Sequence, residues 1–168
     1  MANYTWSKAL DYESLDRNAN LPQDPNNMRA EHGPADFDRR HNFVTSFLYN
    51  LPFPGQQRIL SKFTQGWRTN GIFRFVSGSP LTIVPGTDRA LRGGGGQRAD
   101  VIGNPVLSSE RSFDAQRAQY FNTAVFALPA LGTYGNSGRN AIYGPGQYNL
   151  DLSFFKTTTI AERARVEF

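Results

Sequence analysis

The sequence contains no cysteine among its 168 residues, no long apolar run and only two histidines. Without cysteine there is no disulfide scaffold, no thiolate zinc site and no thiol nucleophile. No segment approaches the roughly 18 apolar residues of a membrane-spanning helix, and the mean hydropathy is −0.51. The first ten residues alternate polar and aromatic side chains, so we expect no signal peptide in this chain.

The residues that are present favour β-structure. Aromatic residues make up 13% of the chain and charged residues only 19%. The 16 glycines and 10 prolines interrupt the chain often. This composition is more typical of strands joined by long loops than of a helix bundle.

Five segments are predicted as strands, and the first, third and fourth of them show the two-residue period with one apolar and one polar face. The third is the clearest, because Trp67, Phe73 and Phe75 alternate with Arg68 and Arg74. The expected strands are residues 1–10, 41–51, 67–77, 148–155 and 163–168. Because each connection joins neighbours most simply as a hairpin, we predict an antiparallel meander of about five strands in sequence order.

The connections between these strands alternate in length. Residues 11–40 and 85–146 form long irregular stretches, whereas residues 52–66 and 156–162 form shorter turns. Outer-membrane β-barrels have long extracellular loops and short periplasmic turns in this way. Tyr49, Phe53 and Trp67 flank one short turn, where an aromatic girdle is expected. A soluble all-β ligand-binding module also has alternating strands and remains the alternative.

Strands of this kind predict one face toward lipid and one toward a polar lumen, because Arg or Lys on the lipid face costs about 2–4 kcal/mol at mid-membrane. The residues expected on the lipid face are Tyr4, Trp6, Phe43, Phe47, Trp67, Phe73, Phe75, Leu150, Leu152 and Phe154. The residues expected to face the lumen are Arg68, Asn70, Arg74, Asn149 and Asp151.

A second group of polar residues lies where the first long loop meets the second strand. Asp36, Asp38, Arg39, Arg40 and His41 follow one another closely. His41 as a base oriented by Asp36 or Asp38 is conceivable, but no nucleophile motif accompanies it. We interpret these five residues as a loop-junction ion cluster and expect no enzyme activity.

Other ligand motifs are incomplete. Asp16, Asn18 and Asn20 have the spacing of the start of a calcium loop, but the central glycine and the final glutamate are missing. Gly93–Gly96 is not followed by the Lys-Ser/Thr pair of a phosphate loop. We therefore expect no metal and no cofactor. The arginines are scattered singly apart from Arg39-Arg40, so a net charge of +4 predicts a solvated basic face and not a nucleic-acid partner.

Several motifs resemble those of one family, and they occur in the same order. The first are Tyr4-Thr5-Trp6-Ser7-Lys8, the segment Asp36-Phe37-Asp38-Arg39-Arg40-His41, Leu51-Pro52-Phe53, and Gly66-Trp67 followed by Ser77-Gly78-Ser79-Pro80. The later ones are Tyr120-Phe121-Asn122-Thr123, Gly135-Asn136-Ser137-Gly138-Arg139-Asn140, and Asn149-Leu150-Asp151-Leu152-Ser153. Together they cover nearly the whole chain. They resemble TonB-dependent outer-membrane receptors of the Oar-like type, which carry a carboxypeptidase-regulatory-like N-terminal domain.

The resemblance implies a transmembrane β-barrel of about 22 strands closed around an N-terminal plug. It implies a receptor in the cell outer membrane of a Gram-negative-type bacterium that takes up a scarce nutrient. The substrate, a small molecule, peptide or glycan, is not specified. The expected partners are outer-membrane lipid and the TonB complex, reached through the plug. Residues 1–168 resemble a late part of the barrel, so we expect a fragment with no plug, no signal peptide and no closed wall.

Overall fold

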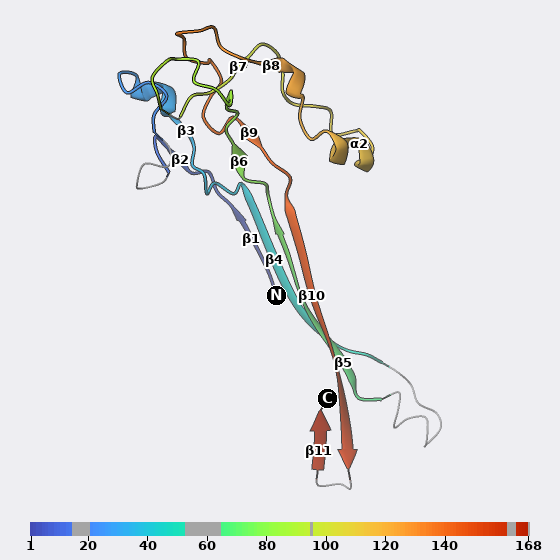
Figure 1. Cartoon of the computed structure of the whole chain (residues 1–168). Coiled ribbons are helices and arrows are strands. Elements are labelled where there is room, and N and C mark those ends of the chain that lie inside the picture. The colour runs from blue at the N-terminus through green and yellow to red at the C-terminus, as the bar shows by residue number, and fades with distance from the viewer. Residues whose placement is uncertain (15–20, 53–64, 95, 161–163, 168) are drawn as a thin grey trace. The chain divides into compact units, whose positions relative to one another are not determined.

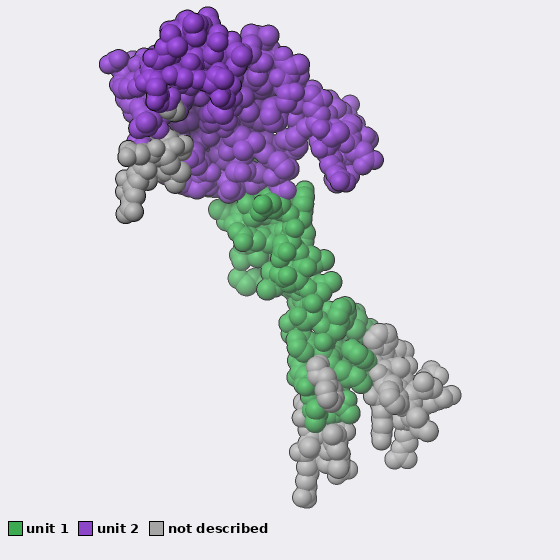
Figure 2. All heavy atoms as spheres, viewed as in Figure 1, with its two compact units in different colours: residues 1–5, 41–76, 147–168 green, residues 6–40, 77–146 purple. Residues whose placement is uncertain are grey.

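The computed structural model describes residues 1–14, 21–52, 65–94, 96–160 and 164–167 (Figure 1). The chain divides into two compact units (Figure 2). The first consists of residues 1–5, 41–76 and 147–168, and the second of residues 6–40 and 77–146. Each unit is therefore built from segments that are distant in sequence. Phe53, Phe168 and the calcium-like residues 16–20 lie outside the described residues.

The first unit is built on a five-stranded sheet with the order β1-β4-β5-β10-β11. Its strands are β1 (Ala2–Trp6), β4 (His41–Asn50), β5 (Trp67–Val76), β10 (Gln147–Ile160) and β11 (Ala164–Glu167). β4 pairs antiparallel with β5, β5 with β10, and β10 with β11. At the β1 edge, Met1 and Ser46 exchange backbone N–H···O bonds of 2.8 and 2.9 Å. The predicted meander in sequence order is confirmed.

Two strand boundaries differ from the prediction. β1 ends at Trp6 because the next residues bind outside the ladder, where the Ala9 N–H donates to Asp38 Oδ1 at 2.8 Å. β10 continues to Ile160, although a turn was expected from residue 156. The β-branched run Thr157-Thr158-Thr159-Ile160 suits an extended backbone, and it pairs with β11.

The second unit contains short elements in the stretches predicted to be irregular. Three two-residue pairings join β2 (Leu10–Asp11) to β3 (Gly33–Pro34), β6 (Pro80–Leu81) to β9 (Ile142–Tyr143), and β7 (Asp100–Val101) to β8 (Phe126–Ala127). The helical elements are η1 (Met28–Glu31), α2 (Phe113–Ala118) and η2 (Thr123–Val125). Among the described residues, no helix has the length and apolar character needed to cross a membrane.

Polar side chains dominate the interior of the second unit. Its buried hydrophobic residues are small or few, namely Ala35, Ala99 and Ile142. The buried polar and charged residues are Gln23, Glu31, Asp38, Gln97, Arg98, Ser137, Arg139 and Asn140. Hydrogen bonds and ion pairs therefore supply much of what holds these long connections together.

Candidate functional site

The strand register of the first unit separates apolar from polar side chains. Residues directly opposite each other in a ladder share a face of the sheet. Phe75 lies opposite Phe43 on one side and Tyr148 on the other, and Gly71 lies between Phe47 and Leu152. Arg74 lies opposite Asn149 on the other face. β10 thus repeats the alternation of β5, whereas Val44 and Leu48 of β4 lie on the face of Arg74 and Asn70.

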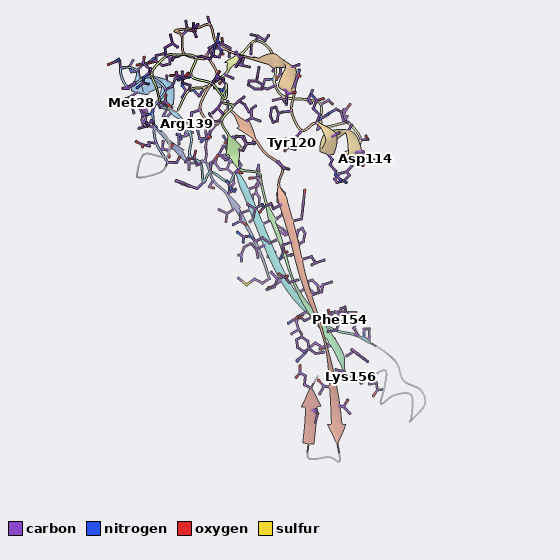
Figure 3. All side chains as sticks on the ribbon, viewed as in Figure 1. Met28, Asp114, Tyr120, Arg139, Phe154 and Lys156 are labelled. Atoms are coloured by element: carbon purple, nitrogen blue, oxygen red, sulfur yellow. The ribbon has the colours of Figure 1, made fainter. Side chains whose placement is uncertain are left out.

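The apolar face is rich in exposed aromatic residues, among them Phe154, whose side chain is labelled in Figure 3. Tyr148 is 74% exposed and Phe154 61% exposed. The ring of Tyr148 lies 4.9 Å from that of Phe75 between centroids. At the other end of β5, Lys156 Nζ lies 5.3 Å from the centre of the Trp67 ring and donates to the Gln65 carbonyl at 2.7 Å. Aromatic rings therefore occupy both ends of this face, as in the girdles of membrane barrels.

The strand length matches the thickness of a membrane. β5 contains 10 residues. With about 3.3 Å per residue this is about 33 Å, and a tilt of about 40° reduces it to about 25 Å along the membrane normal. The apolar band of an outer-membrane barrel has about this height.

The five polar residues expected to face the lumen, Arg68, Asn70, Arg74, Asn149 and Asp151, lie together on one face of the sheet, which Phe155 shares opposite Arg68. Asn149 Nδ2 donates to Asp151 Oδ2 at 2.7 Å, and Arg68 forms an ion pair with Glu167. A hollow of about 700 Å³ is lined by Asn70, Asp151 and Ser153 together with the apolar Leu48 and Ile72. Polar and apolar side chains therefore both occur on this face.

The loop-junction residues are brought together only in part. Arg40 Nε donates to Asp38 Oδ2 at 2.9 Å, and the Tyr143 hydroxyl donates to the same oxygen at 2.7 Å. Arg39 instead binds backbone, donating to the Asp38 carbonyl at 2.9 Å. His41 belongs to the five-stranded sheet, where its Nδ1 lies 2.8 Å from the Tyr4 hydroxyl.

Asp36 joins a different set of contacts from Asp38. Asn140 Nδ2 donates to Asp36 Oδ1 at 2.6 Å, and the Arg139 guanidinium lies 3.6 Å from the same oxygen. The sequence cluster is therefore split among two polar networks and the sheet.

The environment of Asp38 changes the acidity of two groups. Burial alone raises the pKa of Asp38, but hydrogen bonds from the Ala9 N–H, the Tyr143 hydroxyl and Arg40 together lower that pKa below its ordinary value. Burial and the bond to Asp38 raise the pKa of the Tyr143 hydroxyl. Asp38 thus stays ionised as the acceptor that joins the loop-junction to β9.

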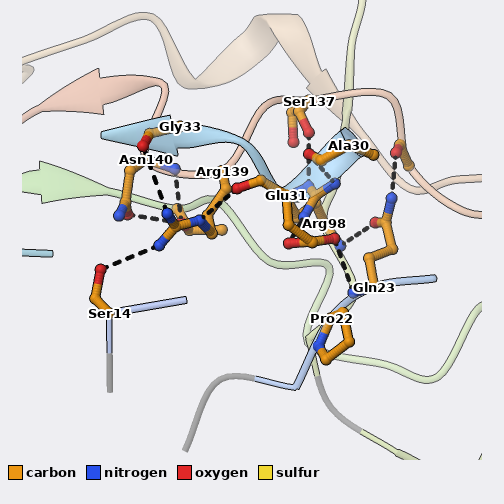
Figure 4. Close-up of polar contacts among 12 residues, drawn as sticks. Ser14, Pro22, Gln23, Ala30, Glu31, Gly33, Arg98, Ser137, Arg139 and Asn140 are labelled. Atoms are coloured by element: carbon orange, nitrogen blue, oxygen red, sulfur yellow. Dashed lines mark hydrogen bonds and ion pairs between the residues drawn. The ribbon is translucent and has the colours of Figure 1, made fainter. Parts of the chain in front are cut away.

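A buried network that the sequence did not predict holds the second unit together (Figure 4). Arg98 donates to the Glu31 carboxylate at 2.7 Å and to the carbonyls of Ser137 and Ala30. Glu31 also accepts from the Gln23 N–H at 3.0 Å. These bonds join residues 23–31 to residues 98 and 137.

Arg139 is the centre of a second part of the network. Its guanidinium donates to the Glu31 carbonyl at 2.9 Å, to Ser14 Oγ at 3.2 Å and to Asp11, whose carboxylate forms an ion pair with it. The sequence analysis gives Gly135–Asn140 only as a family motif. The one arginine in this run of small, turn-forming residues is the sequence feature that could have indicated a buried hydrogen-bonding residue.

In the described part of the chain, no three His, Cys, Asp or Glu side chains are grouped as metal ligands. A small cleft of about 310 Å³ occurs in the second unit, lined by residues 105–121 and 141–143. It is distinct from the polar face of the sheet.

One of three comparisons with known proteins found a match. A family model described as an outer membrane beta barrel domain matches residues 1–168. Searches of curated proteins and of solved structures found no match.

Proposed function

The chain belongs to the outer membrane β-barrel domain family and lies in the outer membrane, and we propose that it forms part of a TonB-dependent receptor for a scarce nutrient. In this proposal the five-stranded sheet is a section of the barrel wall, and the second unit consists of two long loops of that barrel. The polar face of the sheet lines the lumen.

One observation carries the proposal most directly. A sheet of about membrane thickness has most of its aromatic side chains on one face, and Arg68, Asn70, Arg74, Asn149 and Asp151 on the other. A membrane barrel needs this division, since its outer surface meets hydrocarbon and its inner surface meets water. The ordered motifs that resemble TonB-dependent receptors supply the finer assignment.

The proposed barrel is larger than this sheet. β1 and β11 are the outermost strands of the sheet order, and each has one paired side. Unpaired backbone groups cost several kcal/mol each in lipid, so a working wall requires further strands on both sides. We place about 22 strands in the complete barrel, as in plugged outer-membrane transporters. The TonB complex acts through the plug, and outer-membrane lipid covers the aromatic face.

A binding and transport role is favoured over catalysis. His41 contacts Tyr4 within the sheet, while Asp38 is occupied by Arg40 and Tyr143. A general base must reach the proton that it removes, and both candidate groups serve structural contacts instead. We propose that this part of the protein holds no catalytic site.

The soluble all-β ligand-binding module is the less favoured alternative. A soluble module would bury the apolar face of its sheet, because large exposed apolar patches drive association. Tyr148, Leu150 and Phe154 are each more than half exposed. The family match also supports the membrane assignment.

The proposal is tested by TonB binding. The intact outer-membrane protein that contains residues 1–168 is purified in lipid nanodiscs, and its affinity for the purified periplasmic domain of TonB is measured. A variant of the intact protein that lacks the segment upstream of the barrel is the control. We expect binding that depends on this segment. Absence of binding, or equal binding by the control, would reject the receptor assignment.

A further inference from the structure

We infer that the cleft beside α2 is a recognition site for a predominantly apolar or aromatic small molecule that carries no positive charge, and this inference rests on the proposed receptor function. The family match and the polar face of the sheet do not specify a substrate class. This inference assigns one to the second unit. The cleft is lined by Val106, Leu107, Tyr120, Phe121, Ile142 and Tyr143. Its volume of about 310 Å³ is at the lower end of the range of ligand pockets.

The loop that forms the cleft is closed by backbone hydrogen bonds at its base. β7 pairs with β8, and beyond this pair the Ile102 N–H donates to the Val125 carbonyl at 2.9 Å. The Asn122 N–H then donates to the Pro105 carbonyl at 2.9 Å. Residues 102–125 therefore form a closed loop whose two ends are held side by side, a form that is often functional.

Two side chains brace the same loop from within. Arg111 donates to the carbonyls of Ser108, Ala115 and Gln119 at 2.9–3.2 Å. Gln116 Nε2 donates to the carbonyls of Ser109 and Arg111. The loop thus holds its shape through polar contacts and does not need its apolar side chains as a core. A preformed site binds with a smaller entropy cost than a flexible one.

The aromatic walls are also fixed. The Tyr120 hydroxyl donates to the Gly144 carbonyl at 3.0 Å. The ring of Phe121 packs edge-on against Phe126, with centroids 6.1 Å apart. Tyr143 is held by its bond to Asp38. In contrast, Val106 remains 75% exposed at the cleft. The site therefore combines rigid rings with an uncovered apolar edge.

The charges around the cleft select against cationic ligands. Among the described residues that line it, Arg111 alone is charged. The three guanidinium nitrogens of Arg111 each donate to a backbone carbonyl, which uses three of its five N–H donors and does not neutralise its positive charge. A cation placed here would lose water without gaining a strong partner, since no acidic residue lines the cleft. The hydroxyls of Ser108 and Ser109 suit a neutral polar group at the end of an apolar body.

The test uses three probes with the same indole ring and different charges. They are tryptophol, which is neutral, indoleacetate, which is an anion, and tryptamine, which is a cation. Binding to the intact protein in nanodiscs is measured by saturation-transfer NMR, with empty nanodiscs subtracted. We expect tryptophol and indoleacetate each to bind at least about fivefold more tightly than tryptamine, which is a difference of about 1 kcal/mol.

Two matched variants locate the binding. Val106→Asp places a charge at the cleft, and Ile102→Asp places the same charge on the same loop at a residue that is 74% exposed and outside the cleft lining. Neither side chain is buried, so both variants should fold. Val106→Asp should weaken tryptophol binding about tenfold and should improve tryptamine binding. Ile102→Asp should change neither by more than about twofold.

The inference is overturned if tryptophol fails to bind, if tryptamine binds more tightly than tryptophol or indoleacetate, or if the two variants behave alike. TonB binding is measured on the same samples and does not require a ligand in the cleft. Loss of probe selectivity with TonB binding retained would reject this site alone. Failure of TonB binding with intact probe selectivity would reject the receptor proposal and keep the site.

Discussion

The guanidinium of Arg98 and the carboxylate of Glu31 form an ion pair of 2.7 Å in which both side chains are only 3% exposed. The two residues are 67 positions apart, on the two long connections that the sequence predicted as separate loops. Because each charge satisfies the other away from water, neither connection can hold its residue there alone. The two connections therefore fold as one unit.

Arg98→Ala should strongly destabilise the second unit. Removal of one partner leaves the Glu31 carboxylate buried without its main compensating charge, which costs about 3–5 kcal/mol of unfolding free energy. Native-state proteolysis of the intact protein would measure this change. Arg117→Ala, at an exposed position of α2, is the control and should lower the unfolding free energy by less than about 0.5 kcal/mol. Equal effects of the two substitutions would contradict the importance of the buried pair.

Gly78→Ala should disrupt the pairing of β6 with β9. A Cβ atom added at Gly78 would lie 1.8 Å from the Gly144 carbonyl oxygen, which is backbone and cannot rotate away. We expect a loss of about 1–3 kcal/mol in unfolding free energy, measured by the same proteolysis. Gly94 faces open space, so Gly94→Ala is the matched control and should be nearly neutral. If Gly78→Ala left the unfolding free energy unchanged, the backbone segments at Gly78 and Gly144 could move apart at little cost.

The sheet could be predicted from the sequence because each strand carries its own signal. The alternation of Phe73 and Phe75 with Arg74 fixes the faces of β5 locally, and β10 repeats it. The connections between consecutive strands then predict that the strands pair in sequence order. Boundaries were less certain, since the Thr157–Ile160 run reads equally as a polar turn or as β-branched strand.

The second unit could not be predicted in the same way. Its stability depends on bonds such as Arg98–Glu31 and Arg139–Asp11, which join residues far apart in sequence. No period or spacing marks such pairs, and a single arginine in a loop is usually solvated. The cleft beside α2 was missed for the same reason, because it forms only when residues 105–121 meet residues 141–143.

Acid should loosen the second unit through Asp38. The pKa of Asp38 is lowered in the folded protein, so its contribution to stability is complete above the unfolded value of about 3.9 and is lost as the pH falls through the folded pKa. Proteolysis rates between about pH 6 and about pH 2 should rise steeply at the acid end.

The substitution Asp38→Asn tests whether Asp38 causes this sensitivity to acid. It should reduce stability at neutral pH and flatten the acid dependence, leaving the smaller part due to Asp88, whose pKa is also lowered, mainly by its bond with Gln97. Asp114→Asn, at an exposed position of α2, should leave the profile unchanged. An unaltered acid profile in Asp38→Asn would assign the effect elsewhere.

Adjacent residues of β10 offer a matched test of the two faces. Leu150 lies opposite Phe73 on the apolar face, and Asn149 lies opposite Arg74 on the polar face. Leu150→Arg should lower the unfolding free energy of the intact protein in lipid vesicles by about 2–4 kcal/mol, while Asn149→Arg should have a much smaller effect. Urea titration followed by tryptophan fluorescence gives both values. Similar losses for the two variants would contradict the assignment of the faces.

Residues 1–168 expressed alone should aggregate. The outermost strands of the sheet order are β1 and β11, and each has one side without a partner strand in that order. Unpaired N–H and C=O groups at such edges recruit further strands in water, and the exposed aromatic face adds apolar attraction. Few charged residues protect the strands, because Lys156 is the single lysine within β4, β5 and β10. Sedimentation of the refolded chain without detergent should therefore show large, heterogeneous particles, and addition of detergent should reduce their size. A monodisperse monomer that unfolds cooperatively in water would contradict both the open sheet edges and the lipid-facing role of the aromatic residues.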